Sequence, residues 1–598
     1  MMQKIYNIGK YVEKNYPQYN VAYEDLSDGG KYKHLLTIRL KTGKRKILFD
    51  KVDYEEIMAE KNLLYLYKQG SPRGTDFTPC SKITKSFQGS YELKIESFFK
   101  KNNQDQLLKD IYDCLLENKE KILKQGEEKA KAITGKEGKA LTLILDDRYI
   151  GELEEIKAVF NASSSTEYYE KYNTFSRADN KLCSVCRKKQ EVYGFVNTYN
   201  FYTVNEDGMV AGGFNKAAAW KNYPVCPVCA SLLGTGKNYI NTRLNFNFYG
   251  YNYLLLPGFF LAQKSIYKEF FSLIEHYLKD LKLNRETSKA VISKEDQILD
   301  LLGKNKDYMN YSLLFYDAPK GIDGAVFNII LLIEDVYPSR LKMIFDLIRK
   351  IDKKEYLQYI RSNKEEYYFH FGVVREIYPY ESKNQQNMKP FLAMAEKIFK
   401  DHKISYHKLL TDMLFQIRKS FKQGYDHRSK TLKFYAFLEF MLALEMFYDY
   451  QGKRGGTMQE NNNQYSKYFD ENRSFFTSYE KKVSFLMGIL VQRLLNIQYM
   501  DKKSTPFYNR LKGLNLDREL LASLFPQAVN KLTEYGKNYY KKLESVIADY
   551  FVKAGADWKD SEKEISFAFC LGMSLAKSTD LMIEDNKEGE EKEENEQE

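Results

Sequence analysis

The sequence lacks the features of an exported or membrane-spanning protein. No apolar run approaches eighteen residues, and the first twenty residues, "MMQKIYNIGKYVEKNYPQYN", contain no apolar core of a signal peptide. We therefore expect a cytoplasmic protein that makes no membrane contact. Only seven cysteines occur in 598 residues, and in a reducing compartment so few thiols argue against a disulfide framework.

The sequence also lacks the common motifs of catalytic sites. None of its six histidines belongs to an HExxH motif, to an HxE motif with downstream cysteines or to a His-Asp dipeptide. No GxSxG elbow, Walker motif or dinucleotide fingerprint is present. Asp146 and Asp147 are adjacent, so on a strand they point to opposite faces and make a poor two-metal pair. These absences predict a binding protein rather than an enzyme, although carboxylates far apart in the sequence could converge in the fold.

The charge of the chain is unevenly distributed. The formal net charge is +11, but residues 584–598 contain nine acidic residues and two lysines, so the remaining residues carry about +18. An excess of this size is typical of a protein with a polyanionic partner. The alternative is a compositional bias, because Lys, Asn, Tyr, Ile and Phe all have AT-rich codons. The acidic tail itself is predicted to be disordered.

The patterning predicts an α+β N-terminal region with an inserted four-cysteine zinc-binding module, followed by an all-α C-terminal helical bundle. Residues 34–49 alternate around a Thr-Gly turn and predict a hairpin, and residues near 140 and 325 predict buried strands. Helical spacing is found at 106–124 and 339–352 and then, from Lys389 onward, at 390–400, 404–422, 431–449, 478–499, 516–524, 528–553 and 563–578. In the range 528–553, apolar and aromatic residues three or four apart form a stripe, namely Leu532, Tyr535, Tyr539, Leu543, Val546 and Tyr550.

We expect at least two domains, since the chain exceeds what one hydrophobic core organises. The predicted boundaries are an α+β domain at 1–385 with the zinc-binding insert at 178–245, a helical connecting region at 386–450, a helical bundle at 458–583 and the tail at 584–598. The clearest linker is the polar, glycine-rich stretch 451–464.

Four cysteines form the pattern C-x2-C-x39-C-x2-C, namely Cys183, Cys186, Cys226 and Cys229. Each CxxC pair can place two sulfurs on one ion, and two pairs complete a tetrahedron around zinc. Four thiolates leave no position for an activated water, so the predicted zinc is structural. A redox CxxC pair and uncoordinated core thiols are the alternatives.

The 39-residue insert between the two CxxC pairs is predicted to carry a binding element. Residues 192–204 are aromatic and predict a strand, followed by a loop rich in glycine and alanine. Small residues permit close approach to a groove, and Asn and Lys can engage its acceptors. The predicted contact residues of this loop are Asn215, Lys216, Trp220, Lys221 and Asn222. The alternative is an alanine-rich helical turn packed behind the zinc.

Further basic residues are candidates for contacts with a nucleic-acid backbone. After the second CxxC pair, "GTGKNYINTRLNF" offers Lys237 and Arg243 as a phosphate nest, although it is too short for a Walker loop. The hairpin tip holds Arg39, Lys41, Lys44, Arg45 and Lys46. The other candidates are Arg73 in a Pro- and Gly-containing loop and Arg418, Lys422, Arg428 and Lys430 in a basic stretch. Each of these could equally be a solvated surface residue.

Three stretches together resemble a known family. They are "YLYKQGSPRGTDFTPCSKIT", the paired CxxC motifs followed by "NFNFYGYNYLLLPGF", and the end segments "FLMGILVQRLLNIQ", "PFYNRLKGLNLDRELL" and "SFAFCLGMSLAKS". They are similar to the large subunit of type I-B CRISPR Cascade, the Cas-eight-b family, in its CxxC-CxxC branch. The resemblance spans nearly the whole chain and is specific mainly at the cysteines.

The resemblance implies a non-catalytic subunit whose partners are the CRISPR guide RNA, target double-stranded DNA, the other Cascade subunits and a recruited helicase-nuclease. The chain would bind the 5′ handle of the guide, recognise the PAM and help separate the strands, while base pairing reads the target. The loop residues Asn215, Lys216, Trp220 and Asn222 are then candidates for PAM contact and for the wedge between strands.

The resemblance also implies that the C-terminal helices can be made separately as the small subunit. Residues 454–458, Arg-Gly-Gly-Thr-Met, can be encoded with a ribosome-binding sequence before Met458, which gives a 141-residue product. Two alternatives to the Cascade function remain. One is a zinc-ribbon enzyme that processes RNA or modifies nucleotides at a site assembled only in the fold, and the other is a free-standing ribonucleoprotein adaptor.

Overall fold

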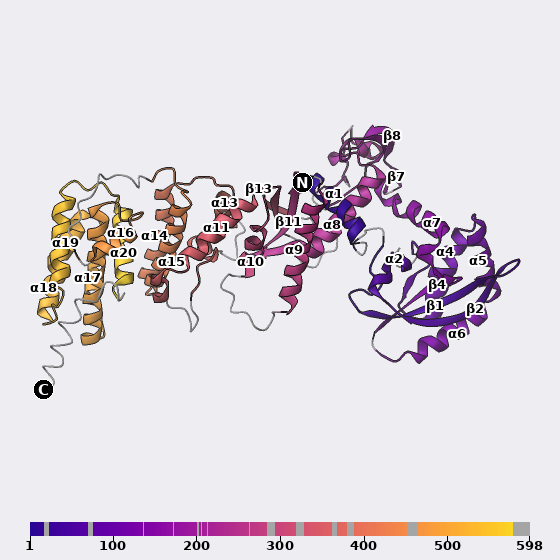
Figure 1. Ribbon diagram of the computed structural model, residues 1–598, viewed down its shortest axis with the longest axis horizontal. Coiled ribbons are helices and arrows are strands. Elements are labelled where there is room, and N and C mark those ends of the chain that lie inside the picture. Colours follow the sequence, from indigo (N-terminus) through magenta and orange to yellow (C-terminus); the bar gives the residue numbers. More distant parts are fainter. Residues whose placement is uncertain are drawn as a thin grey trace. The chain divides into compact units, whose positions relative to one another are not determined.

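The computed structural model describes most of the chain. The described residues are 1–16, 19, 23–69, 76–135, 137–171, 173–199, 202–204, 206–211, 213–261, 263–283, 294–317, 328–360, 367–379, 388–450, 463 and 465–577. The chain forms two compact units, whose elements are labelled in Figure 1. The first unit comprises Met1–Glu269 and Ser312–Leu332, and the second comprises Phe270–Tyr311 and Ile333–Glu598.

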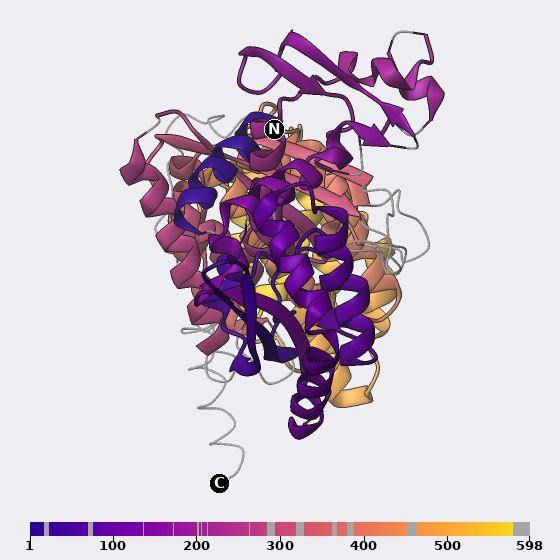
Figure 2. The same ribbon diagram turned by 90° about the vertical axis from the view of Figure 1, so that its right-hand side faces the viewer.

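The N-terminal part of the first unit is a sheet covered by helices (Figure 1 and Figure 2). Its strand order is β2-β1-β4-β3, with β5 paired to β4. The bounds are β1 Tyr32–Thr42, β2 Ile47–Glu56, β3 Ser81–Ile83, β4 Gly138–Leu145 and β5 Arg148–Tyr149. The hairpin predicted at 34–49 is confirmed as β1 and β2. Since β1 also pairs in parallel with β4, it is a central strand, and Leu35, Leu36 and Ile38 are buried accordingly.

Helices pack on this sheet, and two of them contact β2. The helices of this part are α2 Asn62–Tyr65, α3 Phe87–Ser90, α4 Ser97–Lys101, α5 Gln106–Glu117, α6 Lys119–Ala132 and α7 Glu154–Ser164. The helical spacing predicted at 106–124 is confirmed, but two helices, α5 and α6, share this range and meet at Asn118. The Asn118 side chain donates a hydrogen bond of 2.9 Å to the carbonyl of Cys114 and so ends α5. Asparagine competes with the helical backbone for hydrogen bonds in this way.

The rest of the first unit holds the two segments that carry the cysteine pairs. Its short strands are β6 Glu170–Lys171, β7 Thr174–Phe175, β8 Arg177–Leu182 and β9 Lys189–Tyr193. A second four-stranded sheet has the order β10-β11-β12-β13, with the bounds Asn245–Phe248, Tyr251–Phe259, Met309–Asp317 and Asn328–Val336. The division between the two units falls within β12 and β13.

Helix α1 (Met2–Asn15) crosses α8 (Pro227–Arg243) at two glycines. A Cβ atom on Gly9 would lie 1.9 Å from the carbonyl oxygen of Leu232, and one on Gly236 would lie 2.2 Å from that of Ile5. Both distances are far below van der Waals contact, so only glycine permits this crossing. The two backbones therefore touch without side chains between them.

The aromatic strand predicted at 192–204 is mostly wrong. β9 ends at Tyr193, and the described residues that follow, up to Val204, form no strand. Phe195 and Val204 instead pack with Val210 and Ala219 in a small separate core. Burial of these apolar side chains, not strand pairing, accounts for the aromatic composition.

The second unit is mainly helical after β13. Its helices are α10 Lys294–Leu302, α11 Pro338–Ile351, α12 Gly372–Ile377, α13 Met388–Phe399, α14 Tyr406–Lys422, α15 His427–Ala443, α16 Ser466–Glu471, α17 Tyr479–Lys502, α18 Arg518–Glu534, α19 Lys541–Ala554 and α20 Glu562–Leu575, while α9, Lys264–Leu283, begins in the first unit. The predicted fold class is confirmed: an α+β region with a four-cysteine insert precedes a helical region. The linker residues 451–462, with Met458, and the acidic tail lie outside the described residues.

The helix predicted at 528–553 is wrong. Helix α18 continues through Pro526 and ends at Glu534, and α19 begins at Lys541. Gly536 follows the end of α18 with a φ of 66°, a left-handed conformation that commonly ends helices at glycine. Tyr535 and Tyr539 therefore lie between two helices and are not part of one continuous stripe.

Helix α17 is the centre of the C-terminal helices. By length and composition it could cross a membrane, but most of it is buried inside the second unit. It crosses α20 at Gly488 and Gly572, where a Cβ atom on Gly572 would lie 1.8 Å from the carbonyl oxygen of Phe485. Helices α14 and α15 also pack on α20. The contact between α17 and α20 is therefore the core of the C-terminal helices.

A buried ion pair joins α17 to α20. The Lys481 ammonium is 3.0 Å from a Glu564 carboxylate oxygen, and the Lys481 side chain is 1% exposed. Burial raises the pKa of Glu564, but Lys481 and Ser561 outweigh it, so the pKa lies below 4.5. Burial lowers the pKa of Lys481, but Tyr450, Glu564 and Asp560 outweigh it, so the pKa lies above 10.5. Each group is therefore held in its charged form.

We expect Lys481→Met to destabilise the second unit by about 3–5 kcal/mol, because the variant leaves a buried carboxylate without its cation. The double variant Lys481→Met with Glu564→Gln should recover most of the loss.

The ion pair also predicts how stability depends on pH. The contribution of Glu564 to the free energy of unfolding is present above pH 4.5 and is lost as the pH falls through its lower folded-state pKa. That of Lys481 is present below pH 10.5 and lost as the pH rises through its higher folded-state pKa. Urea denaturation across pH measures both, and equal stability of the single and double variants would contradict the pairing.

Candidate metal centre and nucleic-acid interface

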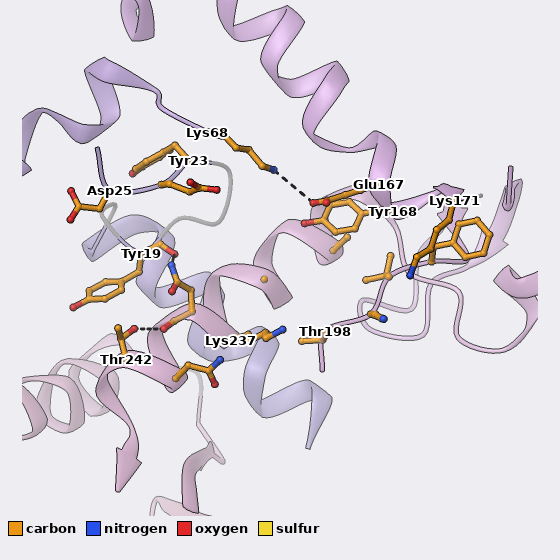
Figure 3. Close-up of a pocket in the computed structure, with 18 of the residues that line it drawn as sticks. Tyr19, Tyr23, Asp25, Lys68, Glu167, Tyr168, Lys171, Thr198, Lys237 and Thr242 are labelled. Carbon is orange, nitrogen blue, oxygen red and sulfur yellow. Dashed lines mark hydrogen bonds and ion pairs between the residues drawn. The ribbon is translucent and has the colours of Figure 1, made fainter. Parts of the chain in front are cut away.

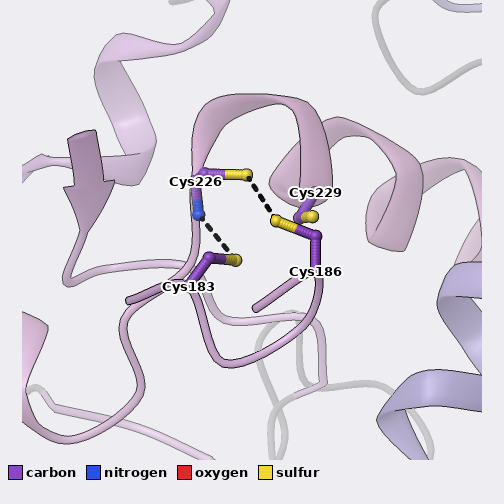
Figure 4. Close-up of side chains that lie close together, drawn as sticks. All are labelled: Cys183, Cys186, Cys226 and Cys229. Atoms are coloured by element: carbon purple, nitrogen blue, oxygen red, sulfur yellow. Dashed lines mark hydrogen bonds between the residues drawn. The ribbon is translucent and has the colours of Figure 1, made fainter. Parts of the chain in front are cut away.

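The four predicted ligands meet in one place (Figure 4). The sulfur atoms of Cys183, Cys186, Cys226 and Cys229 all lie within 4.8 Å of one another, and those of Cys186 and Cys226 are 3.9 Å apart. Four sulfurs at about 2.3 Å from one tetrahedral zinc ion would be about 3.8 Å apart. None of the seven cysteines, all within the described residues, forms a disulfide. The four residues therefore fit a metal ion and are compatible with zinc.

Two local structures position the sulfurs. Cys183 and Cys186 lie in the turn between β8 and β9, where the backbone N–H of Cys183 donates to the carbonyl of Lys188 at 3.0 Å. Cys226 caps α8, and Cys229 lies in its first turn. Tyr193 and Val225 form an isolated bridge that joins the two segments. The chain therefore brings the pairs together by backbone pairing as well as by sulfur.

Hydrogen bonds reach two sulfurs of this cluster, and the pKa is lowered at Cys226 but raised at Cys183 and Cys229. The backbone N–H of Cys226 donates to the Cys183 sulfur at 3.4 Å, and the Gln190 amide donates to the Cys186 sulfur at 3.2 Å. A hydrogen bond from Cys229 is the largest cause that lowers the pKa of Cys226 to about 5. Burial raises the pKa of Cys183. A bound cation would remove the repulsion among four buried thiolates, and its chemistry would be structural, because four protein ligands fill a tetrahedron.

The insert loop is held against the cysteine module by buried serine. The Ser176 hydroxyl donates to the carbonyl of Ala217 and accepts from the backbone N–H of Trp220, both at 3.0 Å. Residues Lys216–Lys221 form a 3-10 helix, and Ala219 is fully buried. The packed alanine turn, the alternative to a binding loop, is thus correct for the inner side of this segment.

Two predicted contact residues are used to shape the loop. The Asn222 side chain accepts from the backbone N–H of Ala211 at 2.6 Å and donates to the carbonyl of Met209 at 2.7 Å. The Asn215 side chain caps the 3-10 helix by accepting from the backbone N–H of Ala217 at 3.0 Å. The amide nitrogen of Asn215, which is exposed, remains available to a ligand, whereas both polar atoms of Asn222 are occupied.

Trp220 is partly buried and lies between two cations. The ammonium groups of Lys181 and Lys221 are each 5.7 Å from the centre of its rings. Contacts of this kind stabilise a fixed ring position. Lys221 is exposed and Lys216 is half-buried, so both lysines of the loop lie at or near its surface. That Lys216, Trp220 and Lys221 contact nucleic acid stays a prediction.

The sequence reasoning missed Phe214, at the tip of the loop. Its side chain is 70% exposed, and its φ of 61° places it in the left-handed region, next to Gly213 with a φ of 79°. A bulky residue in this conformation is unusual and commonly marks a functional site. The available signal was a phenylalanine directly before Asn215 and after two glycines, but Trp220 offered the larger ring.

Only two of the five basic residues of the hairpin tip remain candidates for contacts with nucleic acid, because the other three form ion pairs. Arg39 pairs with Glu55 at 2.6 Å, Lys41 pairs with Asp50 at 3.2 Å, and Lys46 pairs with Glu117. Lys44 and Arg45 are exposed in the turn between β1 and β2 and form no ion pair with any described residue. Arg73 lies outside the described residues.

The predicted phosphate nest is wrong as local structure, because Lys237 and Arg243 lie on helix α8. The Lys237 ammonium is 5.2 Å from the ring centre of Tyr199, and burial lowers its pKa. The Arg243 guanidinium is 5.8 Å from the ring centre of Tyr19. Glycines 234 and 236 are helical, so they form no loop around a phosphate.

The basic stretch of the second unit is divided between interior and surface. Arg418 donates to the carbonyl of Leu514 at 3.2 Å and to the Ser566 hydroxyl at 3.3 Å, and burial lowers its pKa. Lys430 donates to the Ser420 hydroxyl at 2.7 Å, and burial lowers its pKa as well. Lys422 is exposed and Arg428 is half-buried. Of the four residues, Lys422 is the most accessible to a polyanion.

The fold and the cysteine site define a class of protein: an α+β region with an inserted four-cysteine module that could hold a metal ion, and a helical C-terminal region. Models of the CRISPR-associated protein TM1802 family match three successive parts of this chain: the N-terminal domain matches residues 1–162, the central domain 180–336 and the C-terminal domain 369–587. The chain therefore belongs to this family of CRISPR-associated proteins, and its role lies in CRISPR defence together with other CRISPR components. None of the curated proteins matches it.

We expect the purified chain to contain one metal ion, and Cys183→Ser combined with Cys226→Ser to lose it, because two ligands cannot complete the tetrahedron. Elemental analysis of freshly purified protein measures the ion and identifies it. Cys114→Ser is the matched control, since Cys114 is a buried thiol outside the cluster and should leave the metal content unchanged. A wild-type chain without metal, or a double variant that retains it, would contradict the assignment.

Proposed function

We propose that this chain is the non-catalytic large subunit of a type I-B CRISPR RNA-guided surveillance complex. It binds the 5′ handle of the guide RNA, recognises the PAM on target duplex DNA, supports separation of the strands and helps recruit the helicase-nuclease. Base pairing with the guide reads the target sequence, while the protein contributes PAM contacts and phosphate contacts. Membership of the TM1802 family and the resemblance of the cysteine region support this proposal.

The observation that carries the proposal is the form of the insert loop. Its inner side is fixed by Ser176 and Ala219, and its tip presents an exposed ring at Phe214 followed by Asn215 and Lys216. An apolar side chain on a rigid support can enter a base step and unstack it, while neighbouring polar groups bind groove atoms. We assign the wedge to Phe214, with Trp220 as part of its support, and contacts with the PAM to Asn215, Lys216 and Lys221.

Zinc in the cysteine site supports this function by holding the loop, and the chain itself breaks no covalent bond. Within the described residues, the cysteine quartet is the one group of three or more His, Cys, Asp or Glu side chains placed to share a metal ion. Its ligand set favours structure over catalysis. Cleavage then belongs to the recruited partner.

The C-terminal helices are also made separately as a small subunit in this proposal, through an internal start at Met458. In the full chain, α14 and α15 pack on α20, so the short product would present that face of α20 to another subunit. The coding sequence tests this internal start. A ribosome-binding sequence before the Met458 codon would support it, and its absence would contradict it.

We expect Phe214→Ala to lower the affinity of the assembled complex for target DNA by about tenfold, because one base–aromatic contact contributes about 1–3 kcal/mol. Opening of the duplex, followed by 2-aminopurine fluorescence beside the PAM, should fall in parallel. Phe260→Ala is the control, since Phe260 is also an exposed phenylalanine of the first unit and lies outside the loop. Unchanged opening in Phe214→Ala would remove the loop from the proposal.

We expect Lys44→Ala with Arg45→Ala to weaken binding evenly across nucleic-acid sequences and to reduce the slope of log affinity against log salt by about 2, since each lost phosphate contact removes about 0.9 from it. Lys46→Ala is the matched control, because Lys46 is already paired with Glu117. Binding measured from low to high salt gives the slopes. Equal slopes for wild type and the double variant would show that the hairpin tip touches no phosphate.

A further inference from the structure

The first unit contains a cavity of about 980 Å³ (Figure 3), and Lys237 is the one predicted contact residue that lines it. Its lining comes from the segment before β1, from α2, from the turn before β6, from the residues after β9 and from α8. Four aromatic side chains line it, namely Tyr19, Tyr23, Tyr168 and Phe195. Four amide side chains line it as well, namely Asn62, Asn197, Asn238 and Asn241. A cavity of this size holds a ligand as large as a nucleotide.

Helix α8 forms one wall of the cavity. Ala230, Gly234, Lys237 and Asn241 recur at helical spacing and all line it. Small side chains at the first two positions leave room beside the helix, while the next two positions carry polar groups. Since Cys226 caps α8 and Cys229 lies in its first turn, the helix that forms this wall starts at the cysteine cluster.

Two buried polar atoms beside the cavity have no hydrogen-bond partner among the residues that the structure describes. They are the hydroxyl oxygen of Thr198 and the side-chain oxygen of Asn197, and Thr198 is only 7% exposed. A buried polar atom without a hydrogen bond costs about 1–3 kcal/mol, so native proteins usually satisfy such atoms with water, an ion or a ligand. Both residues line the cavity, and Figure 3 shows the Lys237 side chain extending toward Thr198. A ligand with donors and acceptors would satisfy these atoms.

The charges of the lining decide which part of a nucleotide fits. Three lysines, Lys68, Lys171 and Lys237, face four carboxylates, Glu24, Asp25, Glu167 and Glu170. Lys68 is 3.7 Å from Glu167 and so is largely neutralised. A run of phosphates needs a net positive groove. This lining favours an uncharged ring system with hydrogen-bonding edges.

We propose that this cavity binds one unstacked nucleobase of a single-stranded nucleic acid, with its ring against the tyrosines and its edge hydrogen-bonded to Asn197 and Thr198. Proteins read single-stranded nucleic acid in this way, by stacking splayed bases on aromatic side chains and by bonding their edges. The inference rests on the proposed function, since it places a base of the guide RNA or of the displaced DNA strand in the first unit.

The experiment combines an abasic scan with a threonine variant. Single abasic positions are introduced through the unpaired 5′ part of the guide RNA and, separately, through the displaced DNA strand. Retention of the chain in the assembled complex measures the RNA arm, and affinity for target DNA measures the DNA arm. We expect one position in one arm to weaken binding by about three- to tenfold, the effect of a lost base contact. The arm in which it occurs identifies the source of the base.

Thr198→Val tests the contact directly. The Thr198 hydroxyl forms no hydrogen bond with any residue in the described ranges, so its removal should leave the thermal stability unchanged or raised. In complexes that contain this variant, removal of the sensitive base should weaken binding much less than it does in the wild-type complex. Asn241→Ala is a second variant at an exposed position of the cavity wall, where folding is not at risk, and it should weaken binding in the same arm.

Two outcomes separate this inference from the proposed function. If the complex assembles and binds target but no abasic position matters, or if Thr198→Val retains the full abasic effect, the cavity does not hold a base and the proposed function is unaffected. If the chain fails to assemble with guide RNA and the other subunits, the proposed function fails, and the cavity proposal fails with it.

Discussion

The convergence of four thiols on one point is the constraint on which the first unit depends. Cys183 and Cys226 are separated by more than forty residues of chain, yet their sulfurs lie within 4.8 Å of each other, and the bridge of Tyr193 with Val225 pairs the two segments. A single ion at this point would fix the start of α8 relative to β8 and β9. The insert loop leaves and returns at this junction, and Ser176 and a small apolar core hold its inner side.

Helix α8 transmits that constraint to the rest of the unit. Its first turn holds two of the thiols, one face touches α1 through Gly236, and another face lines the large cavity. A shift of its N-terminus would therefore alter the α1 contact and the cavity wall together. Helix α8 is thus the element that the cysteine module and the cavity have in common.

Local patterns in the sequence predicted what local physics determines. The CxxC spacing predicted that the four cysteines converge, the Thr-Gly turn predicted the β1–β2 hairpin, and helical spacing located most helices. Predictions were wrong where the environment of a residue depends on partners that are distant in the sequence. Arg418 has the composition of a surface cation, but Leu514 and Ser566 hold it inside the second unit. The exposure of Phe214 likewise depends on Ser176 and on the small core beneath the loop, and no window of sequence contains all of these residues.

The crossing of α17 and α20 has a consequence for exchange between relatives. At Gly488 and Gly572 the two backbones meet with no side chain between them, so neither helix can adjust to a changed partner by repacking. Recombination that imported only one of these helices from a relative would bring together two contact surfaces that do not fit, and the hybrid would be unstable. The two helices should thus be inherited as a block, and chimaeras that move both together should retain a folded C-terminal region.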